Sequence, residues 1–205
     1  MDLNRKIRDF EAGFRELYLD AIPLLHHETP TGKGSGHYLS FSTIFSGIEC
    51  LASMFSGKQP VKNNTGDRFK KFVPLYFGSP TYATHVDDLW LLRCSLAHSF
   101  SPGGKFTLTT GNPRHHFLAA TDGRICLNAE TFLQDFVKAA DRYFQDLRGR
   151  KGVQQKFELS VRQTGTTHRN VELPTLPGSE MKLNKVWVQT SQNAGTNVSH
   201  ISRAF

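Results

Sequence analysis

Apolar residues recur at alternating spacings of three and four along this chain, and that spacing constrains its fold more than any other feature. One such stripe covers residues 3–21, a second covers residues 38–56, and the most regular one covers residues 133–147. The spacing gathers apolar side chains on one face of a helix, which must then pack against another helix. With 205 residues, a hydrophobic fraction of 38% and 16 phenylalanines, the chain can bury a sizeable core. The sequence therefore predicts a mainly helical domain, with further helical stretches over residues 67–77 and 82–97.

A change of period between the helices predicted over residues 82–97 and 133–147 indicates strands. Residues 106–110 read as one strand. Residues 115–121 and 124–127 flank Asp122-Gly123, a dipeptide that supplies the positive φ angles of a tight turn. We therefore expect a β-hairpin inserted between the helices.

The chain changes character after its last apolar stripe, and we divide it into a helical domain over residues 1–148 and a basic extension over residues 149–205. The first part holds 17 Lys/Arg against 15 Asp/Glu, and the second holds 8 against 3. Phe157, Leu159 and Val161 alternate with polar residues, which predicts a strand. Few other apolar residues follow, so we expect the extension to be partly strand and partly disordered.

The positive charge of the extension suits an acidic partner such as RNA. The candidate nucleic-acid-binding residues there are Lys156, Arg162, Lys182 and Lys185. The nearby aromatic rings of Phe157 and Trp187 can either stack on bases or anchor the extension on the helical domain. Both interpretations stay open.

The absence of several sequence features bears on the cellular compartment and on cofactors. The first six residues lead into an amphipathic pattern rather than an apolar signal, and the three cysteines stand singly, so we expect a cytoplasmic protein. Residues 39–56 come nearest to a membrane span, but their apolar positions are periodic and we interpret them as a core helix. The histidine pairs 26–27 and 115–116 have no metal-ligand spacing around them, so we expect no metal and no cofactor.

The segment with the strongest chemical content is Arg93-Cys94-Ser95-Leu96-Ala97-His98, at the end of the helix predicted over residues 82–97. In an unbroken helix, positions five residues apart point about 140° away from each other. Arg93 and His98 therefore converge only if the helix ends between them or if a second molecule completes the site. The Pro-Gly-Gly run at residues 102–104 predicts a helix end near His98.

This arrangement resembles the HEPN superfamily. The similarity lies in a helical hairpin, a third helix that ends in Arg93, four residues and His98, and a further long helix, over roughly residues 1–148. The resemblance implies an up-and-down helical bundle, here with an inserted β-hairpin and a strand-prone extension. It also implies a homodimer whose two Arg/His pairs face one another across a cleft and cut RNA without a metal.

On this resemblance His98 is the general acid and base, and Arg93 clamps the phosphate. Supporting candidates are Glu49, Cys94 and Asp88, and Arg93 has Asp87, Asp88 and Glu49 as potential ion-pair partners. Cys94 stands where active members commonly carry Asn or Asp. Two functions therefore remain: an endoribonuclease of a toxin or defence type, or an inactive HEPN-like module that binds RNA or a protein partner such as an antitoxin.

Overall fold

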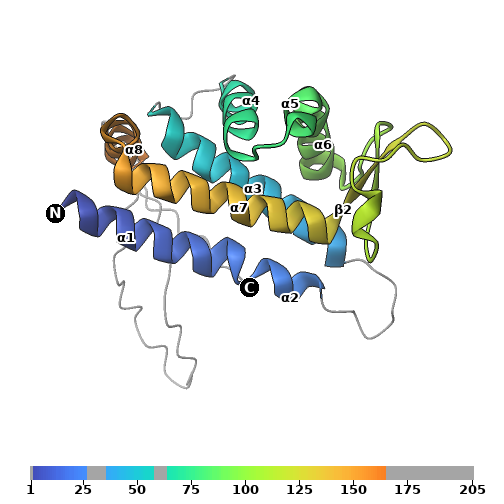
Figure 1. The fold of residues 1–205 in the computed structure, drawn as a ribbon, viewed down its shortest axis with the longest axis horizontal. Coiled ribbons are helices and arrows are strands. Elements are labelled where there is room, and N and C mark those ends of the chain that lie inside the picture. The colour runs from blue at the N-terminus through green and yellow to red at the C-terminus, as the bar shows by residue number, and fades with distance from the viewer. Residues whose placement is uncertain (1, 27–35, 58–63, 165–205) are drawn as a thin grey trace, which may run out of the picture.

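The computed structural model describes residues 2–26, 36–57 and 64–164, and this part of the chain is mainly helical (Figure 1). Its elements in chain order are α1 (Leu3–Phe14), a π-helical turn (Arg15–Leu19), α2 (Ile22–His26), α3 (Gly36–Ser56), α4 (Thr65–Tyr76), α5 (Pro80–Thr84), α6 (Val86–Ser99), β1 (Phe106–Thr109), a 3-10 turn (Pro113–His115), β2 (Ile125–Asn128), α7 (Ala129–Gly149) and α8 (Lys151–Thr164). The prediction of a mainly helical chain is confirmed. That the bundle has the HEPN form stays a prediction.

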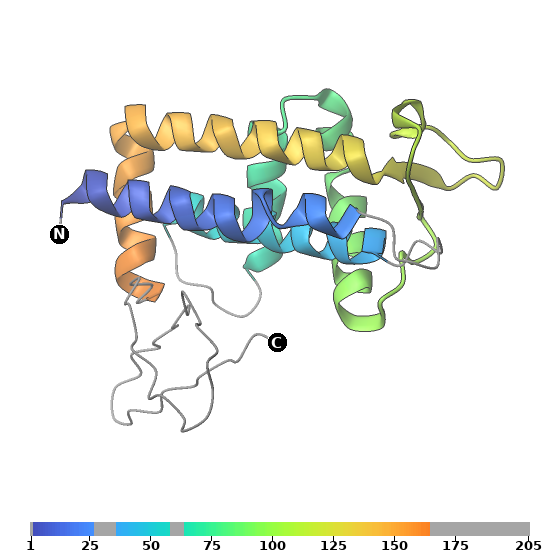
Figure 2. The ribbon, with the colours of Figure 1, turned by 90° about the horizontal axis from the view of Figure 1, so that it is seen from below.

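Helices α1, α3 and α7 run along the long axis of the molecule, and α4, α6 and α8 cross them (Figures 1 and 2). The core between these helices is dominated by aromatic side chains. Those buried most completely include Phe14, Phe41, Phe45, Phe69, Phe72, Phe132, Phe136, Tyr143 and Phe144. Each ring buries a large apolar area, so a stable core is reached with few residues. The stripes predicted over residues 38–56 and 133–147 supply much of this core.

Helix α3 lies at the centre of the bundle and contacts α4, α7 and α8. Its residues His37–Ser56 have a mean hydropathy of 1.3, which by length and composition alone is enough to cross a membrane. Half of that window is buried inside the protein, and Phe41, Ile44 and Ile48 are fully enclosed. Gly47 lets α3 approach α7 closely, because a Cβ there would lie 2.5 Å from Cζ of Phe136.

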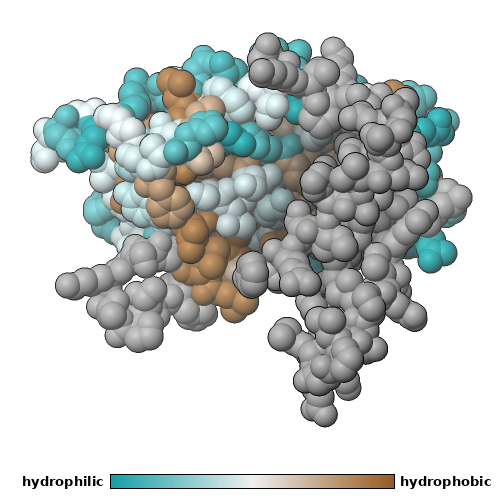
Figure 3. All heavy atoms as spheres, turned by 180° about the vertical axis from the view of Figure 1, so that it is seen from behind, coloured by the Kyte–Doolittle hydropathy of each residue, from teal (hydrophilic) through white to brown (hydrophobic). Residues whose placement is uncertain are grey.

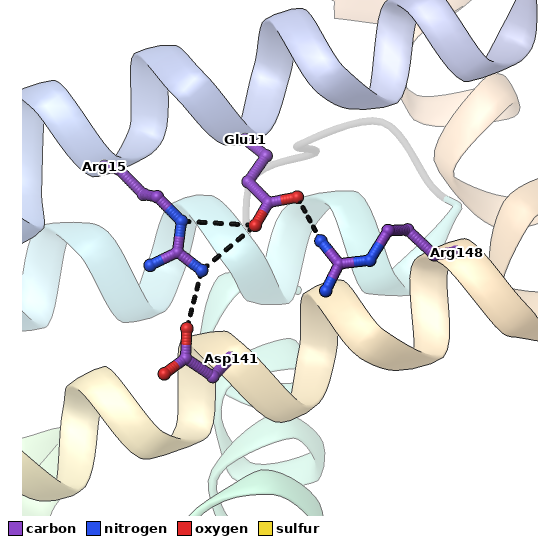
Figure 4. A network of polar contacts seen from close by, with 4 residues as sticks. All are labelled: Glu11, Arg15, Asp141 and Arg148. Atoms are coloured by element: carbon purple, nitrogen blue, oxygen red, sulfur yellow. Dashed lines mark hydrogen bonds and ion pairs between the residues drawn. The ribbon is translucent and has the colours of Figure 1, made fainter.

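A network of charged side chains ties α1 to α7 on the outside of the bundle (Figure 4). The carboxylate of Glu11 accepts hydrogen bonds from Nε and Nη2 of Arg15, at 3.1 and 3.0 Å, and it also pairs with Arg148. Nη2 of Arg15 reaches on to Asp141 at 2.6 Å. Glu11 is the least exposed of the four side chains, so it binds Arg15 and Arg148 where access of solvent is limited.

The expected β-hairpin is only partly correct. Strand β1 pairs with β2 in parallel, with Phe106 opposite Ile125, and the sheet has two strands. The turn at Gly123 has the predicted positive φ of 83°. Residues 115–121, however, do not form a strand, because the chain makes a 3-10 turn at Pro113–His115 and Phe117 takes a positive φ of 60°. An isolated antiparallel bridge joins Ala119 to Ile125, and backbone hydrogen bonds run from Phe117 to Cys126 and from Ala120 to Arg124.

The strand predicted at Phe157, Leu159 and Val161 is wrong, because these residues lie in helix α8. Val153, Phe157 and Val161 recur every four residues and pack against the core, whereas Leu159 is 48% exposed. The alternation of apolar residues was therefore incidental, and the helical period decided the structure. The hydroxyl of Ser160 donates to the carbonyl oxygen of Ser53 at 3.0 Å and fastens α8 to α3. The remainder of the basic extension, residues 165–205, lies outside the described residues.

Candidate functional site

Arg93 and His98 both lie in α6, which continues unbroken from Val86 to Ser99. The helix ends at Phe100, which adopts a left-handed conformation, rather than between the two residues. Five positions apart in one helix, their side chains diverge by about 140°. Within one chain the two groups therefore do not converge, and only a second molecule can complete a shared site.

The side chain of Arg93 is held by Glu49 of α3. Its Nη2 donates to Oε2 of Glu49 at 2.7 Å, and its Nε lies 2.6 Å from Oε1 in a second, ionic contact. The two side chains are only 25% and 17% exposed, so solvent screens the pair weakly. The guanidinium carbon also stands 5.3 Å from the ring centroid of Trp90, a cation–π contact from one turn earlier in α6. Arg93 is thus fixed on both of its flanks.

A second guanidinium, that of Arg68 in α4, stands beside the same pair. Arg68 is only 7% exposed, and it donates to the hydroxyls of Ser53 at 3.0 Å and Thr65 at 3.2 Å. Burial lowers the pKa of Arg68, and the negative charge of Glu49 acts in the opposite direction. Because Ser53 follows Glu49 by one turn of α3, two arginines flank one carboxylate.

Sequence reasoning missed Arg68. No motif surrounds it, and its position beside Glu49 depends on how α4 crosses α3. The only signal in the sequence was a cation inside an apolar stretch, next to Phe69. Gly66 makes the crossing tight, since a Cβ at that position would meet the Trp90 ring at 3.0 Å.

The two aspartates of α6 do not support Arg93. Asp88 contacts Nζ of Lys105 at 3.3 Å and Nδ1 of His85 at 3.4 Å. Asp87 pairs with Lys70 of α4 at 2.6 Å. Of the three potential partners of Arg93, the structure brings only Glu49 to it.

Cys94 and His98 lie on other parts of the α6 surface. Cys94 is half-buried and faces α4, where the pKa of Lys70 is raised mainly by its hydrogen bond to Asp87, with a small contribution from Cys94. His98 is exposed on the last turn of α6.

The candidate RNA-binding residues of the extension divide into two groups. Lys156 and Arg162 are exposed on α8, and Nζ of Lys156 stands 4.7 Å above the ring of Phe55. Phe157 is fully buried, so of the two interpretations of this ring, anchoring is correct and base stacking is wrong. Lys182, Lys185 and Trp187 lie outside the described residues.

A second polar cluster, also missed from the sequence, joins the 110–124 loop to the bundle. The hydroxyl of Tyr82 lies 3.0 Å from Nε2 of His116 and donates to Asp135 of α7 at 3.0 Å. Nδ1 of His116 accepts the backbone N–H of Asn128 at 3.2 Å, which assigns the proton of a neutral ring to Nε2. Burial lowers the pKa of His116, although the negative charge of Asp135 acts the other way. The cluster therefore holds the loop against the bundle.

Within residues 2–26, 36–57 and 64–164, no three His, Cys, Asp or Glu side chains are grouped so as to hold a metal ion. In comparisons with protein-family models, with curated proteins and with solved structures, nothing matches this chain significantly. The function must therefore be argued from the side chains of α3, α4 and α6 themselves.

Proposed function

We propose that this chain is a metal-independent endoribonuclease of HEPN type, of a toxin or defence kind, that acts as a homodimer. The observation that supports the proposal most directly is the Arg93–Glu49 pair. An always-charged fork is held in a fixed direction on α6, and an exposed imidazole stands on the last turn of the same helix. A fixed cation and a titratable base are the two groups that cleavage of a ribose phosphate requires.

The proposed reaction uses these groups as follows. The neutral imidazole of His98 accepts the proton of a ribose 2′-hydroxyl, and the 2′-oxygen bonds to the adjacent phosphorus. The bond from phosphorus to the 5′-oxygen breaks, and that oxygen takes a proton from an imidazolium. The guanidinium of Arg93 binds the non-bridging oxygens, where negative charge accumulates. The products are a 2′,3′-cyclic phosphate and a free 5′-hydroxyl.

The dimer is part of this proposal because of the helix geometry. Arg93 and His98 of one chain diverge by about 140°, so a single α6 cannot present both to one phosphate. Two copies of α6 packed side by side bring the Arg93 of one chain next to the His98 of the other. The second histidine then supplies the proton for the leaving 5′-oxygen.

A second candidate function is favoured by the same contact. Glu49 occupies the donors of Arg93 that a phosphate would use, and Cys94 offers no strong hydrogen bond at the adjacent position. An arginine committed to a carboxylate suits a catalytically inactive module that binds RNA or a protein partner. The exposed cations Lys156 and Arg162 on α8 would then contribute to binding RNA.

The test is incubation of the pure protein in EDTA with single-stranded and structured RNA. We expect cleavage with cyclic-phosphate ends, and at least about a 100-fold loss in His98→Ala and in Arg93→Ala, typical of lost acid–base and charge stabilisation. His115→Ala, which changes another exposed histidine, and Arg150→Ala, which breaks a more exposed pair with Asp146, serve as controls. Cleavage that survives both site substitutions contradicts the proposal. A dimeric wild type that cuts nothing but binds RNA supports the inactive module.

A further inference from the structure

Phe100 combines an unfavourable backbone conformation with an exposed aromatic ring. It ends α6 at φ 51° and ψ 34°, and its N–H donates to the carbonyl oxygen of Leu96 at 3.2 Å. Glycine or asparagine normally occupies this left-handed position, because a larger side chain crowds its own backbone there. The ring is 58% exposed, so core packing does not offset the strain. Strain kept at an exposed side chain points to a role outside folding.

A second aromatic ring lies beside it. Tyr38, in the first turn of α3, is stacked on Phe100 with ring centroids 6.1 Å apart and planes 23° from parallel. The phenol of Tyr38 also contributes to the raised pKa of Arg124, which is set mainly by Asp122. The ends of α3 and α6 and the turn at residues 122–124 therefore meet at this pair. On the face of the molecule drawn in Figure 3, apolar side chains reach the surface among hydrophilic ones.

The stretch of chain that contains Phe100 is basic overall. Residues 98–124 carry Lys105, Arg114 and Arg124 against Asp122, a net of +2 in the sequence, and in the fold Lys105 pairs with Asp88 and Arg124 with Asp122. His98, the proposed acid and base, precedes Phe100 by two residues and is exposed as well. An exposed aromatic ring close to a histidine in the chain, with an arginine near its stacking partner, matches a nucleobase flanked by phosphates better than it matches an apolar protein surface.

We propose that Tyr38 and Phe100 form a stacking platform for an unpaired base of single-stranded RNA, next to the phosphodiester that His98 would cleave. This inference rests on the proposed function and adds the substrate class to it. An aromatic ring stacks on the face of any base but reaches it only when the base is unstacked, so the platform selects single strands over duplexes and carries little sequence preference.

The strain at Phe100 allows a test in which stability and binding move in opposite directions. Phe100→Gly suits φ 51° and removes the ring, so we expect an unchanged or higher melting temperature together with about a tenfold or greater loss of affinity for a fluorescent single-stranded RNA. Phe100→Trp restores a ring, and we expect it to bind like the wild type. Leu91→Ala removes another exposed apolar side chain of α6 and is the matched control. Binding is measured on the full chain in EDTA, in a His98→Ala background that prevents cleavage.

Each outcome decides the inference. Weakened single-stranded binding in Phe100→Gly, with the affinity for a duplex of the same sequence unchanged, supports the platform. Unchanged single-stranded binding overturns it, and it leaves the proposed function standing if the wild type cleaves RNA. Dissociation of a dimer by Phe100→Gly, seen by sedimentation, also overturns it and assigns the ring to an interface between copies. A wild type that neither binds nor cuts RNA overturns both the platform and the proposed function.

Discussion

Glu49 of α3 and Arg93 of α6 are joined at two points, 2.6 and 2.7 Å long, across the place where the two helices pack. The pair is mostly enclosed, and the buried Arg68 lies on the same face of α3. The contact therefore does two things at once. It fixes the direction of the arginine proposed to clamp phosphate, and it compensates positive charge in a place that water reaches poorly.

Glu49→Gln keeps the shape of the side chain and removes its charge. We expect the free energy of unfolding to fall by about 2 kcal/mol, because two guanidiniums then lose their enclosed counter-charge. A double-mutant cycle with Arg93→Met, followed by urea denaturation, measures the coupling directly. Asp87→Asn, which breaks the more exposed pair with Lys70, is the control and should change stability much less. A coupling energy near zero between Glu49 and Arg93 would contradict this account.

His116 makes stability depend on pH. Its folded-state pKa is lowered by burial, so the unfolded chain binds the proton more readily than the folded one. The stabilisation is therefore complete above the unfolded value of about 6.5 and is lost as the pH falls from there towards the lower folded pKa. Protonation at Nδ1 also removes the acceptor of the Asn128 N–H at the start of α7.

The measurement is the urea midpoint at pH 8 and at pH 5 for the wild type and for His116→Gln. The glutamine does not titrate, so the fall in stability between the two pH values should be smaller in the variant. Tyr82, Asp135 and Lys138 face the same cluster and are retained in both proteins. An identical fall in both proteins would mean that other groups carry the whole pH dependence.

Helix α8 predicts opposite results for two neighbouring apolar residues. Phe157 is fully buried beside the ring of Phe10 in α1, so Phe157→Ala should lower the free energy of unfolding by about 3–5 kcal/mol. Leu159 is about half exposed, and Leu159→Ala should change it by no more than about 0.5 kcal/mol. Chemical denaturation of both variants tests the helical period of this segment. Comparable losses would favour the strand instead.

Glu11 is the shared acceptor of the network between α1 and α7 (Figure 4). Glu11→Gln weakens the contacts to Arg15 and Arg148 together, so we expect a loss of about 1 kcal/mol, reduced in high salt because several members are exposed. Asp9→Asn, which breaks the solvent-exposed i,i+4 pair with Arg5, should change the stability very little. Thermal melts at two salt concentrations separate the two cases. A loss in Glu11→Gln that does not depend on salt would point to packing rather than charge.

Much of the helical part of the fold followed from the sequence because its cause is local. The period of three and four over residues 38–56 and 133–147 needs only neighbouring residues to place an apolar face, and α3 and α7 have that face buried. The turn at Gly123 was equally local, since a positive φ is a property of that residue and its neighbours. The motif at Arg93 and His98 was also visible in the sequence. Helix geometry alone showed that a single helix cannot bring the two groups together.

The tertiary structure decided what depends on contacts between distant segments. In α8 the sequence carries two periods, and only the packing of Phe157 and Ser160 against the bundle selects the helical one. The pairing of β1 with β2 in parallel and the buried place of Arg68 beside Glu49 arise in the same way. A pattern along the chain states which face of an element is apolar, but not which element covers it. That choice belongs to the bundle as a whole, because each buried group must find its partners among helices that the sequence places far apart.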